Sequence, residues 1–106
     1  MGYHVVGPLK LADAVAAAGA VASVDFSVDS IHLYSFVSSG TYVATVALEG
    51  SVENGSVTDA NSKWETIGTI SPSGTFLHLL DKAFAKIRAN VTAYTSGTIT
   101  VWMKAV

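Results

Sequence analysis

The sequence predicts an all-β protein, an antiparallel β-sandwich or jelly-roll-like fold of about seven or eight strands. Apolar and polar residues alternate along segments 42–49, 86–94 and 98–104, as they do in half-buried strands. Clusters of Gly, Ser, Asn and Pro separate the alternating segments, as short turns require. The chain has 106 residues and no cysteine, so a single hydrophobic core, without disulfides, is expected to hold one domain together.

Residues 1–22 differ in character from the rest and are interpreted as an N-terminal arm, followed by the sandwich domain at 23–106. Pro8 disfavours helix at Gly7 and has no N–H to donate, so the arm is expected to begin extended. The Ala-rich run 11–18 leaves two alternatives open. Alanine favours a short helix, whereas the absence of an amphipathic stripe favours an extended segment or an edge strand.

The first strands of the domain are expected at 24–28, where apolar residues alternate with Asp and Ser, and at 31–37, which is rich in β-branched and aromatic residues. In the second of these we expect Leu33 to face inward. A further strand is expected at 42–48, after the turn at Ser38-Ser39-Gly40, and it forms the second arm of a hairpin with 31–37. Along this arm one face is expected to hold Tyr42, Ala44, Val46 and Leu48, and the opposite face Val43, Thr45, Ala47 and Glu49.

The second half of the chain continues the pattern. A loop over 50–62 contains Asn54-Gly55, a pair that favours the positive φ angles of a tight turn. Strands are expected at 64–70 and 75–80, and then at the two closing segments. The inward positions of the closing segments are predicted to be Ile87, Ala89, Val91 and Ala93, then Ile99, Val101 and Met103.

The composition of the chain limits the classes of partner that it is expected to bind. Charged residues make up only 13% of the chain, against about 25% in a typical domain. The net charge is −2, and no apolar run reaches the ~20 residues of a membrane span, so neither a nucleic acid nor a membrane partner is expected. The N-terminus lacks the basic region of a secretory signal, so the chain is interpreted as mature from Met1. A surface of small neutral residues suits a subunit packed against others; a monomer with a Ser/Thr-rich surface is the alternative.

No catalytic, cofactor or metal site is predicted, and we expect the chain not to be an enzyme. The sequence shows neither a nucleophile elbow nor a Gly-rich phosphate loop. The three histidines have no His or carboxylate at a ligand-like spacing and are interpreted as surface or interface residues. They are His4, His32 and His78.

One loop is rich enough in oxygen atoms to be considered for calcium. It carries Glu53, Asn54 and Asp59, but their spacing does not match an EF-hand. The alternative is a turn held by Asx side-chain hydrogen bonds.

Four aromatic residues are expected on the outer faces of the strands, opposite the inward sets. Exposed aromatics of this kind anchor protein partners or stack on sugar rings, and we favour the interface. In a two-layer fold some of the four would instead cover core. The four are Tyr34, Phe36, Tyr94 and Trp102.

Three stretches carry a family resemblance. They are the string 42–51 with its Glu49-Gly50-Ser51 end, the segment 63–68 around Trp64 after the Asn-Gly loop, and the closing pair 87–92 and 96–101. Across residues 20–105 the chain resembles small β-sandwich structural proteins encoded by tailed bacteriophages. The resemblance implies a virion protein such as a capsid decoration (cement) protein, a head fibre or a tail accessory module.

The shortness of the chain, without collagen-like or coiled-coil extensions, favours a decoration subunit on the capsid surface. The implied partners are the major capsid protein or other virion proteins, with the subunit acting as a homo-oligomer. The N-terminal arm would then lie across a neighbouring capsid protein, a hypothesis from composition alone. The alternative is a carbohydrate-binding or accessory module of a phage tail or fibre that recognises a host glycan.

Overall fold

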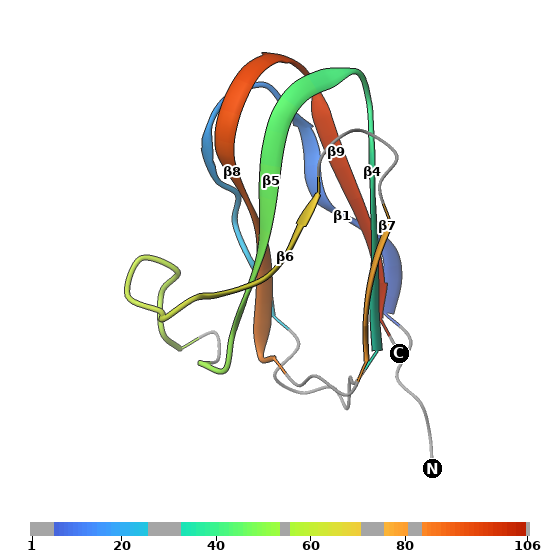
Figure 1. Cartoon of the computed structure of the whole chain (residues 1–106). Helices are drawn as coiled ribbons and strands as arrows, with labels where there is room; N and C mark the ends of the chain where they lie inside the picture. Colours follow the sequence, from blue (N-terminus) through green and yellow to red (C-terminus); the bar gives the residue numbers. More distant parts are fainter. Residues whose placement is uncertain (1–5, 26–32, 54–55, 71–75, 81–83, 106) are drawn as a thin grey trace.

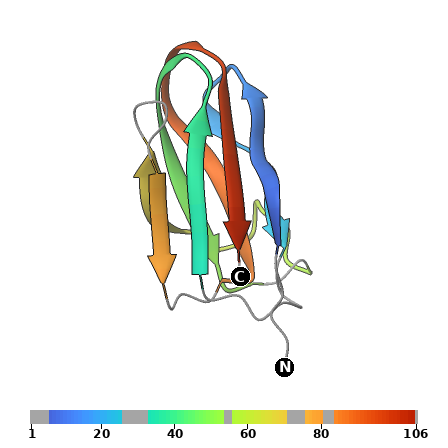
Figure 2. The ribbon, with the colours of Figure 1, turned by 90° about the vertical axis from the view of Figure 1, so that its right-hand side faces the viewer.

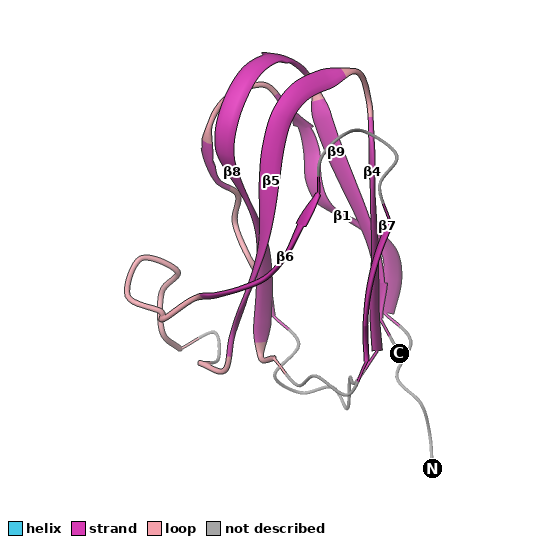
Figure 3. Cartoon of the chain, viewed as in Figure 1, coloured by secondary structure: helices cyan, strands magenta, loops and turns pink. Residues whose placement is uncertain are grey.

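Two antiparallel sheets packed face to face form the molecule, which confirms the predicted all-β sandwich (Figure 1). The computed structural model describes residues 6–25, 33–53, 56–70, 76–80 and 84–105, and these contain no helix (Figure 3). None of them therefore forms a helix that could cross a membrane. The strands are β1 Val6–Val15, β2 Gly19–Ala20, β3 Val24–Asp25, β4 Leu33–Ser39, β5 Tyr42–Ser51, β6 Glu65–Ile70, β7 Phe76–Leu80, β8 Lys86–Gly97 and β9 Ile99–Ala105.

The four-stranded sheet has the order β1-β9-β4-β7, and the five-stranded sheet has the order β2-β8-β5-β6, with β3 also paired to β8. The chain changes sheets between β4 and β5 and again between β8 and β9, through the bends at the top of Figure 1. The expected hairpin between 31–37 and 42–48 is therefore wrong, because these strands face each other across the core. By contrast, β5 and β6 pair directly.

The N-terminal segment belongs to the sandwich. β1 pairs with β9 along the edge of the four-stranded sheet, and Leu11 and Ala12 are each only 2% exposed. Residues 6–15 are thus a strand rather than an arm ahead of the domain, and the extended alternative holds for 11–15. Since Leu11 and Ala12 already pack in the chain's own core, β1 does not need a neighbouring protein to become ordered.

The core confirms most of the predicted inward positions. Ile87, Ala89 and Val91 are buried on β8, and Ile99, Val101 and Met103 are buried on β9. On β5, Tyr42, Val46 and Leu48 are buried and Ala44 packs against the same cluster.

The prediction fails after Val91, where a β-bulge changes the phase. Val91 pairs with Val46 but Ala93 pairs with Thr45, so β8 has one extra residue at this point. As a result Ala93 is exposed, and Tyr94 pairs with Ala44 and packs against the core. Alternation in the sequence cannot reveal such an insertion.

The phase predicted for β4 is also wrong. Tyr34 is 0% and Phe36 is 1% exposed, while Leu33 is only partly buried. Both faces of the segment 31–37 carry large apolar residues, so the alternation itself does not distinguish the inner face from the outer one. The neighbouring strand β9 of the same sheet identifies the inner face of β4, because Phe36 pairs in register with buried Met103 and shares its face.

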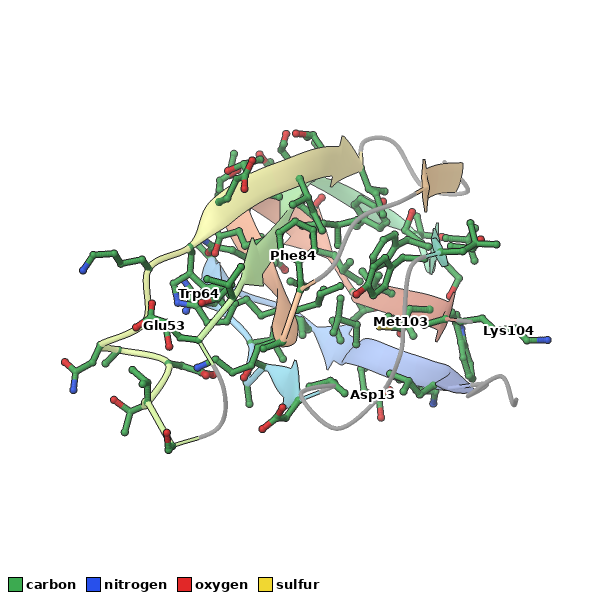
Figure 4. The ribbon with its side chains drawn as sticks, turned by 90° about the horizontal axis from the view of Figure 1, so that it is seen from below. Asp13, Glu53, Trp64, Phe84, Met103 and Lys104 are labelled. Atoms are coloured by element: carbon green, nitrogen blue, oxygen red, sulfur yellow. The ribbon has the colours of Figure 1, made fainter. Side chains whose placement is uncertain are left out.

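Two glycines permit close approaches that a side chain would block. A Cβ at Gly50 would enter the ring of Phe84, so the absence of a side chain lets Phe84 close the lower end of the core (Figure 4). Gly97 has a φ of 92°, and a Cβ there would collide with the backbone of Thr41. Gly97 therefore makes possible the tight crossing from β8 to β9.

Candidate functional site

A cluster of charged side chains lies on the outer face of the five-stranded sheet. Lys86 and Arg88 alternate along β8 with the core residues Ile87 and Ala89, so they project outward. We call this group, with Trp64, Asp59 and Glu49, the Trp64 cluster. It lies at the base of the loop that follows β5 (Figure 4).

Lys86 is covered by this loop and forms hydrogen bonds with it. Its side chain is almost fully buried, and its Nζ donates hydrogen bonds to the Val57 carbonyl at 2.8 Å and to the Ser62 hydroxyl. The same Nζ lies 3.5 Å from Asp59 Oδ1. A buried ammonium needs such compensation, so the loop and Lys86 stabilise each other.

Trp64 packs against both cations. Arg88 Cζ lies 4.1 Å and Lys86 Nζ 5.3 Å from its ring centroid, and its Nε1 donates to the Asp59 carbonyl at 2.9 Å. Arg88 Nε in turn donates to Glu49 Oε1 at 2.7 Å. The charges of the cluster thus contact one another, which indicates that the cluster anchors the loop to the sheet.

The carboxyl group of Asp59 has a lowered pKa. Hydrogen bonds from the Ser23 hydroxyl at 2.7 Å and backbone N–H at 2.9 Å, with the charge of Lys86, hold its pKa below the ordinary value of 3.8, although partial burial opposes them. A lowered pKa means that the folded state favours the ionised carboxylate. The stability it contributes is present above pH 3.8 and is lost as the pH falls through the lowered pKa.

Replacing Asp59→Asn should therefore change the acid sensitivity of the protein. The variant should be less stable than wild type near neutral pH, and the difference should shrink as the pH falls from about 4 to about 2. Urea unfolding of both proteins at several pH values measures it. A difference that stays constant over this range would contradict the role assigned to the carboxylate.

The carboxylates of the candidate calcium loop point to other partners. Glu53 accepts a hydrogen bond from the Lys63 backbone N–H, and Asp59 is bound by Ser23 and Lys86. Asn54 lies outside the described residues. No group of three or more His, Asp or Glu side chains gathers within the described part of the chain. Asp59 reaches across the fold to Ser23, and the alternative of a turn held by Asx side-chain hydrogen bonds stays a prediction for Asn54.

One of the three histidines lies within the described residues. His4 and His32 lie outside the described residues, and His78 lies in β7, where its backbone pairs with Ser35.

A second surface lies on the outer face of the four-stranded sheet, opposite the Trp64 cluster. Lys10, Trp102 and Val37 pair in register across β1, β9 and β4, and Lys104 follows Trp102 on the same face. We call these four residues the Trp102 face. Lys10 Nζ lies 5.1 Å from the Trp102 ring centroid and 3.4 Å from Asp13 Oδ1. Lys104 is exposed, points away from the sandwich in Figure 4 and forms no ion pair with any described residue.

The structure separates the four candidate interface aromatics. Tyr34 and Phe36 are in the core, so the expectation that they are exposed is wrong. Tyr34 also exchanges hydrogen bonds with the Phe84 backbone, and its burial raises the pKa of its phenol. Tyr94 packs against the core and donates to the Gly97 carbonyl at 2.8 Å. Trp102, half-buried, remains on an outer face.

The Trp64 cluster was missed at the sequence level, although a signal for it exists. Lys86, Arg88 and Asn90 alternate with buried residues on one strand, and Glu49 lies on another. Three polar residues on one face of a strand indicate that something polar covers it. The sequence does not show that the covering element is the 52–64 loop.

Comparisons with known proteins concern the fold. No protein-family model matches the chain. No curated protein matches it in sequence. Among solved structures, the chain is similar to the crystal structure of SPBc2 prophage-derived protein YomS, with a TM-score of 0.59 and 12% identity over 92% of this chain and 88% of that one. At this identity the likeness shows a shared fold.

Proposed function

We propose that this chain is a non-enzymatic structural protein of a bacteriophage particle, and more specifically a capsid decoration subunit that binds the head shell. The observation that carries the proposal is the fold match with a prophage-derived protein along nearly the whole of both chains. The phage β-sandwich resemblance of residues 20–105 agrees with it. Only 13% of the chain's residues are charged, and a surface of small neutral residues suits a subunit that packs against others.

The Trp102 face is the surface that best fits a partner. It combines a half-buried indole and Val37 with two exposed lysines. Aromatic residues with a polar rim are the usual energetic centres of protein interfaces. We therefore assign contact with the shell to this face, on the side of the molecule away from the 52–64 loop.

The alternative, a glycan-binding tail or fibre module, depended on surface aromatics that stack on sugars and on the loop over 50–62. Tyr34 and Phe36 are in the core and Tyr94 packs against it, so of the four candidate aromatics Trp102 alone remains for such stacking. A lone aromatic makes a weaker sugar platform, and the decoration function is preferred.

Replacing Trp102→Ala should reduce retention on particles at least about tenfold, because interface anchors contribute about 2 kcal/mol or more. The measurement is co-sedimentation of the purified chain with heads of the phage that encodes it, with unfolding curves to verify that the variant folds. Lys63→Ala, an exposed residue beside the Trp64 cluster, is the control and should bind as wild type does. Equal retention of the Trp102 variant would contradict the assigned face. Saturable binding to host polysaccharide without binding to heads would favour the glycan module.

A further inference from the structure

The edges of the two sheets differ in how well they are protected. An edge strand presents unpaired N–H and C=O groups on which another strand can build, and most proteins obstruct such edges. Here the edges are β1 and β7 in one sheet, and β6 and the short β2 and β3 in the other. Figure 2 shows β1 on one side of the sandwich and β6 beside β7 on the other.

The β1 side is obstructed. β1 contains Pro8, has three register shifts against β9 and carries the exposed Lys10–Asp13 pair. β2 and β3 are two residues long each, too short to guide a partner strand. Prolines, bulges, charges and short strands are the usual means of preventing edge pairing.

β6 lacks most of these devices. It is six residues long and pairs with β5 on one side, with no strand on its other side within the described structure. After Glu65 it has no charge and no proline, and it has one register shift against β5, in the middle of the strand between Thr66 and Gly68. Thr66 and Thr69 are exposed and β-branched, as favourable cross-strand neighbours are.

We propose that β6 is an interface at which a second copy of this chain adds its own β6 antiparallel, so that the two five-stranded sheets join across a two-fold axis. A second copy is the fitting occupant, because a two-fold pairing covers both open edges at once and closes the assembly. Antiparallel pairing also places the two Glu65 carboxylates at opposite ends of the joint. The chain's net charge of −2 gives little repulsion between copies.

This inference deepens the homo-oligomer part of the proposed function and leaves the Trp102 face free for the shell. Trp102 lies on the outer face of the other sheet, whereas β6 is a lateral edge. A dimer joined at β6 would therefore present two shell-binding faces at once, and two linked contacts hold a partner more tightly than either alone.

Sedimentation of the full chain tests the proposal. A pairing this small belongs to the weak class of interfaces, below ~1,200 Å², so the measurement needs protein on the order of 100 µM. Wild type should sediment with about twice the 11.0 kDa monomer mass. The double variant Thr66→Lys/Thr69→Lys should be a monomer, because it places like charges along the joint. The matched control Thr95→Lys/Thr98→Lys, at exposed threonines around the turn from β8 to β9, should stay dimeric.

Hydrogen exchange of wild type provides a second readout that needs no variant. Amides of 65–70 should exchange more slowly at high than at low protein concentration, while those of β1 should not change. A wild-type monomer at high concentration, a β6 variant that dimerises as wild type does, or no concentration dependence at 65–70 would overturn the proposal. Particle retention is a separate assay, so a monomer that still binds heads would refute the β6 dimer and leave the decoration function standing.

Discussion

Replacing Phe36→Ala should lower the free energy of unfolding by roughly 3–5 kcal/mol, a large part of the 5–15 kcal/mol that a domain typically has. The ring is 1% exposed, stacks beside Tyr34 at a centroid distance of 6.4 Å and faces Met103 from the neighbouring strand. Its removal leaves a cavity between the sheets that rigid neighbours cannot fill. Urea unfolding measured by circular dichroism gives the value.

The control for Phe36 is Val43→Ala on β5. Val43 is 60% exposed, so its truncation should change the free energy of unfolding by less than about 0.5 kcal/mol. This pair of variants also separates the two roles considered for Phe36. A surface anchor would leave stability unchanged and affect only partner binding, so a Phe36→Ala protein as stable as wild type would refute the core position.

Replacing Lys86→Met should destabilise the fold by about 2–3 kcal/mol. Methionine keeps the length of the side chain but loses the hydrogen bonds to Val57 and Ser62 and leaves Asp59 without its cation. The expected loss is below the ~3–5 kcal/mol of a fully buried pair, because Asp59 is 35% exposed and water solvates it in part.

A second effect of Lys86→Met is specific to the loop. Without its anchor, the 52–64 loop should be cut by proteases faster than in wild type even under conditions where the sandwich stays folded. Lys63→Met, at an exposed position, should alter neither stability nor cleavage. If the Lys86 variant loses stability without faster cleavage in the loop, then Lys86 supports the sheet and not the loop.

Prediction from the sequence succeeded where a strand has one clearly apolar face. Ile99, Val101 and Met103 alternate with Thr100, Trp102 and Lys104, so only one assignment of the inner face was reasonable. It failed on β4, where Tyr34 and Phe36 compete with Leu33 and Val37 for the core. Burial of an aromatic and of an aliphatic side chain contributes a similar free energy. The local composition therefore did not show which face of β4 is the inner one.

The candidate site was less predictable than the fold. Trp102 was selected correctly as an outward aromatic, whereas Tyr94 was misplaced because a bulge two residues earlier shifts the phase of β8. The Trp64 cluster joins Glu49, Asp59 and Lys86, which lie on separate parts of the chain. Nothing local to any of them indicates that a loop folds back and buries the lysine.

By itself the sequence determined the class of the fold, the positions of the long strands, and the inner faces of β9 and of β8 as far as Val91, because these depend on side-chain spacing within a few residues. Only the tertiary structure decided that β4 and β5 belong to different sheets, that β1 completes one of them, and which aromatics are in the core. These outcomes depend on contacts between residues far apart in the chain, such as Phe36 with Met103 and Lys86 with Asp59. The spacing of apolar residues within one segment contains no information about these long-range contacts.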